Sequence, residues 1–241
     1  MKIANGLEML EIRQGDRVVF PVFAWDETRR VLVDTGFPGQ EPLFAEALSA
    51  LGFSMDQVTE ILLTHQDMDH IGCAKSFLDG APGCRVMAHA DEAPYLTGEK
   101  TPVKLAAMEA SLDTMPEDRR AFYHEFRRGY KNRKLTNVTR LTDGETLPFC
   151  GGVKAIHTPG HTPGHLCLYF QGAKALVAGD ALNIANGALA GPAPQHTLDM
   201  ARATESLEKL LCLDVETVVC YHGGVFHGDV RKEIAALMRL P

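Results

Sequence analysis

The chain has 241 residues, of which 45% are hydrophobic and 23% are charged. This composition is ordinary for a globular protein and excludes a disordered, collagenous or coiled-coil chain. The net charge of −7 argues against a nucleic-acid partner, because phosphate contacts require a basic surface. No apolar run approaches a membrane span, and Glu8 and Glu11 interrupt the start before a signal peptide develops. We therefore expect a cytoplasmic protein with no membrane partner.

The cysteines form no CxxC pair, and several stand in apolar runs such as 166–168. A chain of this length can bury a core without disulfide bonds. We expect all six to be reduced and packed, as in a cytosolic protein. They are Cys73, Cys84, Cys150, Cys167, Cys212 and Cys220.

The first part of the chain alternates short β-branched runs with a helical pattern. Gly52 follows that helix as a C-cap. Such alternation is typical of layered α/β folds. The predicted strands are 17–25, 30–34, 60–64 and 85–88, and the predicted helix is 41–51.

Two helices, 102–112 and 117–130, are predicted between strand-rich halves, and they indicate a helical insertion over about 98–135. Thr197 is predicted to cap the next-to-last helix, with Met200, Ala203, Leu207, Leu210 and Leu211 on its apolar face. The halves indicate two sheets packed face to face with helices outside, in one domain spanning 1–241. The later predicted elements are strands 152–158, 166–170, 174–178 and 216–221, and a last helix over 230–240.

Four groups of chemically active residues each follow a predicted strand, where a sheet holds reactive side chains in place. They are the segment 64–70 (THQDMDH), the segment 157–165 (HTPGHTPGH), Asp180 after Ala178-Gly179, and His222 after Tyr221.

The first group combines imidazole and carboxylate ligands, which suit zinc, iron or manganese. Four ligands from six residues cannot converge on one ion, but they can face two ions about 3.5–4 Å apart. A single histidine at a strand end is usually structural, and Asp69-His70 alone would be an ordinary helix start. The three further groups favour a metal centre, with the remaining ligands supplied by His165, Asp180 and His222.

The motifs resemble those of the metallo-β-lactamase superfamily, from Val33-Asp34-Thr35-Gly36 to His222. The segment 64–70 is similar to its HxHxDH signature and 157–165 to its TPGHTPGH segment. The resemblance implies a four-layer αββα sandwich, closest to the glyoxalase II and acyl-homoserine lactonase branch. It also implies two metal ions. The first would be held by His65, Asp67 and His165, the second by Asp69, His70 and His222, with Asp180 bridging them.

Asp67 departs from the family pattern, which usually has histidine at this position. Flavodiiron proteins of the same fold carry a carboxylate there and bind iron. Asp67 adds a third carboxylate to the centre. The net charge of two divalent ions, three carboxylates and a bridging hydroxide is then near zero, whereas the usual motif leaves +1. We expect zinc as the metal, and the added carboxylate predicts a less electrophilic centre with more tolerance for iron or manganese.

The resemblance implies that a bridging hydroxide attacks an ester, thioester or lactone carbonyl. Asp69 is the candidate for orienting the nucleophile, and Asn183 or a metal for stabilising the oxyanion. Lactonases of this fold carry Tyr at the position of Asn183, so lactonase activity is not specifically indicated. Only 19 residues follow His222, fewer than the glutathione-binding region of glyoxalase II needs, so glyoxalase II itself is not expected.

Three rival functions remain open. A persulfide dioxygenase of this fold would hold one iron through His65, His165 and Asp180. A phosphodiesterase or nuclease is disfavoured by the net acidity, and a flavodiiron reductase by the absence of a following flavin domain. A metal-binding protein without catalysis is the third rival.

Several other residues near the motifs have open roles. His157 and His161 either orient metal ligands or pack the turn. Asp34 resembles a residue that supports the metal loop, or it caps its own turn. No ligand role is expected for the remaining histidines, which are His89, His124, His196 and His227.

The segment 119–134 carries seven basic residues against one acid, Glu125, a local charge of +6. Aromatic residues recur through it at helical spacing. One interpretation is a helix with an aromatic face on the core and a solvated basic face. The alternative is a lid whose Arg127 and Arg128 recruit an anionic small-molecule substrate. Pairing of two chains through this insertion, as a homodimer, is also left open.

Overall fold

Alternating side chains on the central strands divide the apolar core into layers. On β6 (Arg30–Val33), Val31 and Val33 face the space between two sheets, while Leu32 faces the outer helices. Strand β13 (Ala175–Val177) repeats the pattern, with Leu176 turned toward the helices on the other side. The period of two along each strand therefore builds one core between the sheets and one beneath each helical layer.

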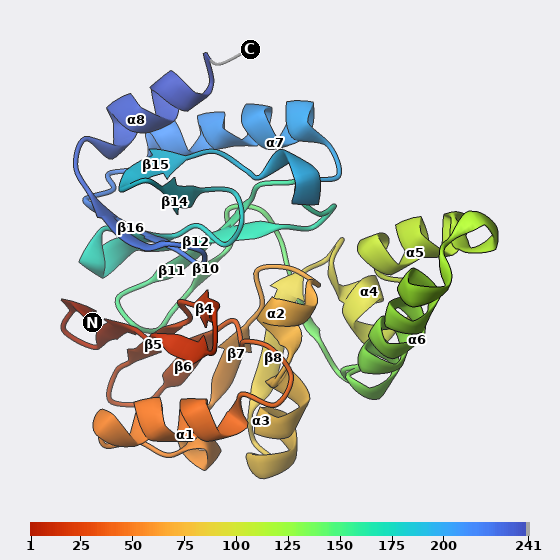
Figure 1. Ribbon diagram of the computed structural model, residues 1–241. Helices are drawn as coiled ribbons and strands as arrows, with labels where there is room; N and C mark the ends of the chain where they lie inside the picture. Colours follow the sequence, from red (N-terminus) through yellow and green to blue (C-terminus); the bar gives the residue numbers. More distant parts are fainter. Residues whose placement is uncertain (240–241) are drawn as a thin grey trace.

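The structure, a computed structural model, describes residues 1–239, and Figure 1 shows the two sheets stacked between outer helices. The first sheet has the order β1 (Lys2–Ala4), β2 (Leu7–Met9), β5 (Val22–Trp25), β6, β7 (Glu60–Leu62), β8 (Arg85–His89) and β9 (Thr139–Leu141). The second has the order β10 (Thr146–Leu147), β11 (Val153–His157), β12 (Leu166–Phe170), β13, β16 (Thr217–Cys220) and β17 (Gly224–His227). Two hairpins, β3–β4 (Ile12–Gln14, Arg17–Val19) and β14–β15 (Asn183–Ala185, Ala188–Ala190), complete the strands.

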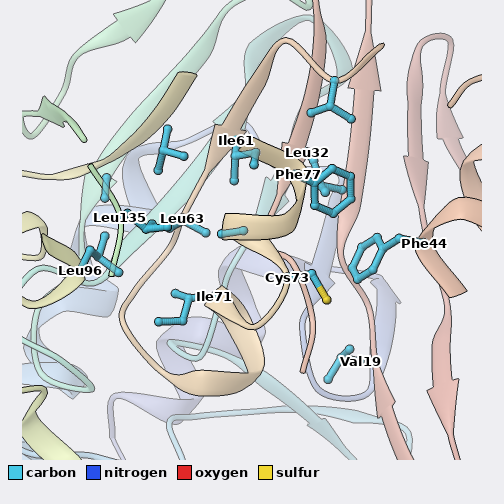
Figure 2. Packing of buried hydrophobic residues seen from close by; sticks show 14 of the residues in the cluster. Val19, Leu32, Phe44, Ile61, Leu63, Ile71, Cys73, Phe77, Leu96 and Leu135 are labelled. Atoms are coloured by element: carbon cyan, nitrogen blue, oxygen red, sulfur yellow. The ribbon is translucent and has the colours of Figure 1, made fainter. Parts of the chain in front are cut away.

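Helices α1 (Glu41–Ala50) and α3 (Ala74–Gly80) cover the outer face of the first sheet. Figure 2 shows the core beneath them, where Phe44 and Phe77 meet edge to face with their ring centroids 5.5 Å apart. Helices α7 (Met200–Ser206) and α8 (Val230–Leu237), with the 3₁₀ turn Leu207–Cys212 between them in sequence, cover the second sheet. This arrangement confirms the expected αββα sandwich.

Between β8 and β9 the chain forms α4 (Ala93–Thr97), α5 (Val103–Ala110) and α6 (Glu117–Asn132), which lie beside the sandwich in Figure 1. The helices α5 and α6 correspond to the insertion predicted over 98–135. Short helix α2 (Met68–Ile71) follows β7. No helix of the described chain has the length and apolar character needed to cross a membrane.

Three predicted elements differ in detail. The expected strand 17–25 divides between β4 and β5, which belong to different sheets, and Pro21, which lacks an N–H for a continuous ladder, lies at the break. The cap of α7 is Asp199, which accepts a hydrogen bond from the Arg202 N–H, so the prediction of Thr197 was wrong. The last helix ends at Leu237, and Leu240, the predicted end, lies outside the described residues.

Candidate metal centre

The loop after β7 is held in shape by the buried Asp34 at the end of β6. Asp34 has a positive φ of 60°, a strained conformation for a residue with a side chain. Its carboxylate accepts hydrogen bonds from the Thr64 N–H (2.9 Å) and hydroxyl (2.7 Å), and it lies 2.8 Å from His70 Nδ1. The Nδ1–H of His70 is therefore directed at Asp34, which leaves Nε2 as the free ring nitrogen. This geometry agrees with the role expected for Asp34 in supporting the metal loop.

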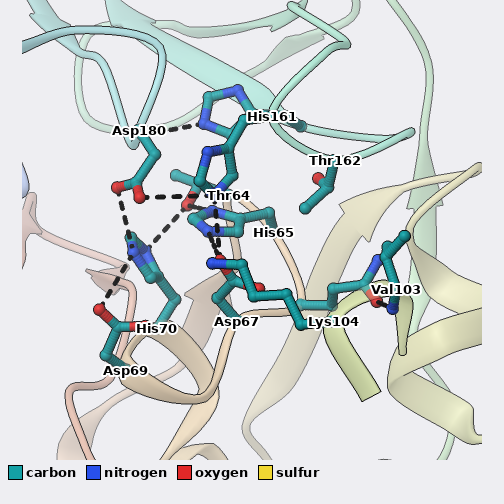
Figure 3. Close-up of polar contacts among 12 residues, drawn as sticks. Thr64, His65, Asp67, Asp69, His70, Val103, Lys104, His161, Thr162 and Asp180 are labelled. Atoms are coloured by element: carbon teal, nitrogen blue, oxygen red, sulfur yellow. Dashed lines mark hydrogen bonds and ion pairs between the residues drawn. The ribbon is translucent and has the colours of Figure 1, made fainter. Parts of the chain in front are cut away.

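The first group of potential ligands consists of His65, Asp67, His161 and Asp180, all buried (Figure 3). Oδ2 of Asp67 lies 3.2 Å from His65 Nε2 and 3.0 Å from His161 Nε2. Asp180 approaches the same His161 nitrogen through Oδ2, at 3.4 Å. These atoms come from the ends of strands in both sheets, so the group forms where the two sheets meet.

The second group consists of Asp69, His70 and His222. His222 Nε2 lies 3.3 Å from Asp69 Oδ2, and His70 Nε2 lies 3.9 Å from the same oxygen. The other oxygen of Asp180, Oδ1, lies 3.3 Å from His70 Nε2 and 3.5 Å from His222 Nε2. Asp180 thus presents one oxygen to each group.

The residues of both groups fit divalent metal ions. His65 Nε2, His70 Nε2 and Asp180 Oδ1 are buried, and none has a hydrogen-bond partner among the described residues. Buried polar atoms without partners are costly, and a metal ion would satisfy these three. Burial lowers the pKa of His65 to about 4, so its imidazole is neutral and able to bind a metal at pH 7.

The structure brings together six of the seven ligands proposed from the sequence and leaves out His165. The N–H of Asp180 donates to His165 Nε2 at 3.0 Å, and the Thr158 hydroxyl lies 2.9 Å from His165 Nδ1. Both ring nitrogens are therefore engaged. His161, which the sequence left as an orienting residue or a turn residue, stands in its place beside Asp67 and Asp180.

Lys104, at the start of α5, directs its ammonium group onto Asp67 Oδ2 (Figure 3). Burial by itself would raise the pKa of Asp67, but His65, His161 and Lys104 hold it well below its usual range. Sequence reasoning missed this contact, because Lys104 lies 37 positions from Asp67 and in no motif.

A second residue missed from the sequence, Glu92, joins the two metal-binding loops. It is fully buried and accepts hydrogen bonds from the N–H and side-chain amide of Gln66, both at 2.8 Å. It also accepts from the Gly164 N–H at 2.7 Å and the Thr162 hydroxyl at 3.1 Å. The sequence signal available for Glu92 was its position shortly after strand β8, because the other candidate site residues also follow strands.

Asn183 lies in β14 and donates its side-chain amide to the Gly191 carbonyl at 3.2 Å. His157 bonds the Pro163 carbonyl through Nε2 at 2.9 Å, which is the turn-packing role. Its ring stacks on His89 with centroids 3.7 Å apart and an angle of 14°, near Asp91. The in-plane lone pairs of two stacked rings run parallel, so these histidines do not converge on one ion.

The aromatic residues of α6 are divided between the core and the surface. Tyr123 and Tyr130 are buried and Phe126 packs against the same core, whereas Phe122 is 57% exposed. Arg127 and Arg128 are exposed. The helix therefore has a core-facing aromatic side and an exposed basic side, an arrangement compatible with both interpretations.

A two-sheet sandwich that gathers histidine and aspartate at its strand ends has the architecture of a metal-binding hydrolase. Residues 15–222 match the metallo-beta-lactamase superfamily, and the chain belongs to that superfamily. The family expected from the motifs is thereby confirmed.

Curated relatives of the chain include proteins named as hydrolases. The chain is 30% identical over 210 residues to the "Probable metallo-hydrolase YflN" of Bacillus subtilis, covering 80% of this chain and 75% of the relative. It is 29% identical over 208 residues to a hydroxyacylglutathione hydrolase of Fuscovulum blasticum, covering 86% of this chain and 62% of that protein.

Solved structures agree on the fold. A metallo-beta-lactamase family protein from Thermus thermophilus superposes with a TM-score of 0.79 at 24% identity, covering 98% of this chain and 79% of that one. The protein TTHA1623, crystallised in a di-iron-bound form, superposes with a TM-score of 0.62 at 23% identity, covering 90% and 94%.

Proposed function

We propose that the protein is a dinuclear metal-dependent hydrolase that attacks the carbonyl of an ester, thioester or lactone. The observation that carries this proposal is the position of Asp180, with Oδ2 toward the first group and Oδ1 toward the second. A carboxylate with one oxygen for each of two neighbouring sites is suited to bridge a metal pair. The relative named hydroxyacylglutathione hydrolase favours an acyl substrate.

Zinc is the proposed metal, with iron or manganese as alternatives, because the donors are imidazole and carboxylate. Bound in the two groups, such ions would lower the pKa of a shared water toward 7 and polarise the carbonyl of the substrate. The ligands are His65, Asp67, His161, Asp69, His70 and His222, with Asp180 between the groups.

The protein's own groups complete the site. The side chain of Asp69 is 21% exposed, so it is accessible from the site and can orient a water and accept its proton. Tyr221 donates its hydroxyl to the Asp69 carbonyl, which holds the main chain of this residue in place. Asn183 uses one amide hydrogen on Gly191 and keeps the other for the oxygen of a substrate.

A panel of esters, thioesters, lactones and phosphodiesters, run with metal quantification, tests the proposal. We expect turnover of at least one carbonyl class and its loss, together with loss of bound metal, in Asp180→Ala. His227→Ala, an exposed histidine at the end of β17, serves as the control and should retain both. Turnover of phosphodiesters alone, or full carbonyl turnover by Asp180→Ala, would overturn the proposal.

A further inference from the structure

A pocket of about 540 Å³ lies in the helical insertion, outside the two ligand groups. Its walls come from the end of α4, the segment 100–102, one side of α5 and one side of α6. Figure 1 shows these three helices together at the side of the sandwich. The volume is that of a site for a small organic molecule.

The pocket is strongly basic. Five cationic side chains line it against a single carboxylate, Glu109. Glu109 is already engaged, since it accepts the Tyr123 hydroxyl at 2.9 Å and lies 3.8 Å from Arg127 Nε. The lining cations are Lys100, Arg127, Arg128, Lys131 and Lys134.

These cations are concentrated although the whole chain carries −7. Among the ion pairs of residues 1–239, none uses Lys100, Lys131 or Lys134, and the one formed by Arg128, with Glu125, joins two exposed side chains. Like charges held together repel unless an anion binds between them. The pocket therefore has positive charge that the protein itself does not neutralise.

The inner wall of the pocket is apolar, with Pro102 and Leu105 buried. Tyr130, a buried residue of α6, also lines it. An apolar wall with a rim of cations suits a molecule that has both a carbon skeleton and charged groups.

We propose that this pocket binds a small organic polyanion through its phosphate or carboxylate groups. Arg127 and Arg128 supply planar donors that match either group, and the lysines add point charges around them. The carbon skeleton of the ligand lies against Leu105 and Pro102.

The pocket is coupled to the metal centre through the first turn of α5. Pro102 and Leu105 face the pocket, whereas the Val103 N–H donates to Gln66 Oε1 at 2.8 Å and Lys104 contacts Asp67. One turn of helix thus touches the polyanion on one side and the ligand loop on the other. The polyanion is either the acidic tail of the substrate itself or a separate molecule that acts on α5.

Pyrenetetrasulfonate, a fluorescent polyanion whose sulfonates bind divalent metals weakly, probes the site by fluorescence anisotropy. In the 241-residue chain we expect Arg127→Gln/Lys131→Gln to weaken binding of the probe by about tenfold or more. The control Arg13→Gln/Arg119→Gln removes the same charge from exposed positions outside the pocket and should bind within about twofold of the unaltered protein. Inorganic pyrophosphate should displace the probe.

Equal weakening in both double variants, or no binding to the unaltered protein, would overturn the proposal. Asp180→Ala must still bind the probe, which separates this site from the metals and from the proposed hydrolysis. The source of the polyanion rests on the proposed function and is decided by kinetics with matched neutral and acidic esters. If Arg127→Gln/Lys131→Gln raises KM for the acidic ester alone, the polyanion is the acidic tail of the substrate. If this variant leaves KM unchanged for both esters, the polyanion is a separate ligand.

Discussion

Lys104 on α5 places its ammonium group on Oδ2 of Asp67, the oxygen that also faces His65 and His161. Asp67 is the residue that departs from the usual histidine of the superfamily motif. The extra negative charge of this carboxylate is therefore accompanied by an extra positive charge from the insertion. The pair compensates the charge of the centre and connects α5 to the ligand loop.

Replacing Lys104 by Met is expected to have opposite effects on the metal-free and metal-loaded protein. Without the ammonium group of Lys104, a metal ion no longer competes with another cation for the Asp67 carboxylate. The dissociation constant of the metal should therefore fall by about tenfold. The metal-free protein should lose about 1 kcal/mol of unfolding free energy, a modest figure because the Lys104 side chain is 36% exposed. Chelator competition and urea unfolding measure the two effects, and weaker metal binding in Lys104→Met would contradict the compensation.

Glu92 should make the stability of the protein depend on pH. Burial raises the pKa of Glu92 from 4.5 to about 7, although its hydrogen bonds oppose the shift. Between pH 4.5 and 7, Glu92 keeps a proton in the folded chain that it releases in the unfolded chain. The stabilisation from this protonation is therefore complete below pH 4.5 and is lost as the pH rises through 7. The loss amounts to about 3 kcal/mol.

Glu92→Gln lacks this ionisation, and the comparison isolates it from other titrating groups. We expect unfolding free energies measured from pH 4.5 to about 8 to show the parent protein losing stability relative to the variant. A difference that stays constant with pH would show that Glu92 does not titrate in this window.

Gly164 permits the close approach of the second ligand loop to Glu92. A Cβ at this position would collide with the Glu92 main-chain nitrogen and lie 2.8 Å from its Cβ. Gly164→Ala should therefore cost about 1–3 kcal/mol of unfolding free energy and reduce the metal content, because the loop carries His161. Gly80→Ala, at the end of α3 with open space around it, should be neutral or stabilising in the same urea titration. Equal stability of the two variants would contradict this close packing.

The fold was predictable where patterns are local. The strands around Leu32 and Leu176 are short apolar runs, and the ligand motifs follow strands directly, so both the sandwich and the position of the site emerge from the sequence. Strands β1 and β15, with three residues each, were not predicted, because neither shows a recognisable period.

The composition of the site was less predictable, because it depends on contacts across the chain. His161 and His165 occupy equivalent places in a repeated TPGH sequence, and contacts with distant residues distinguish them: the Asp180 N–H bonds His165, whereas Asp67 lies beside His161. Lys104 and Glu92 reach the site from segments between the motifs. No local pattern encodes these contacts.

The central claim, two metal sites on either side of Asp180, is tested most directly by anomalous scattering from crystals of the metal-loaded protein. We predict two peaks, one among His65, Asp67 and His161 and the other among Asp69, His70 and His222, each next to one oxygen of Asp180. A single peak, or a peak bound by His165 in place of His161, would contradict this account.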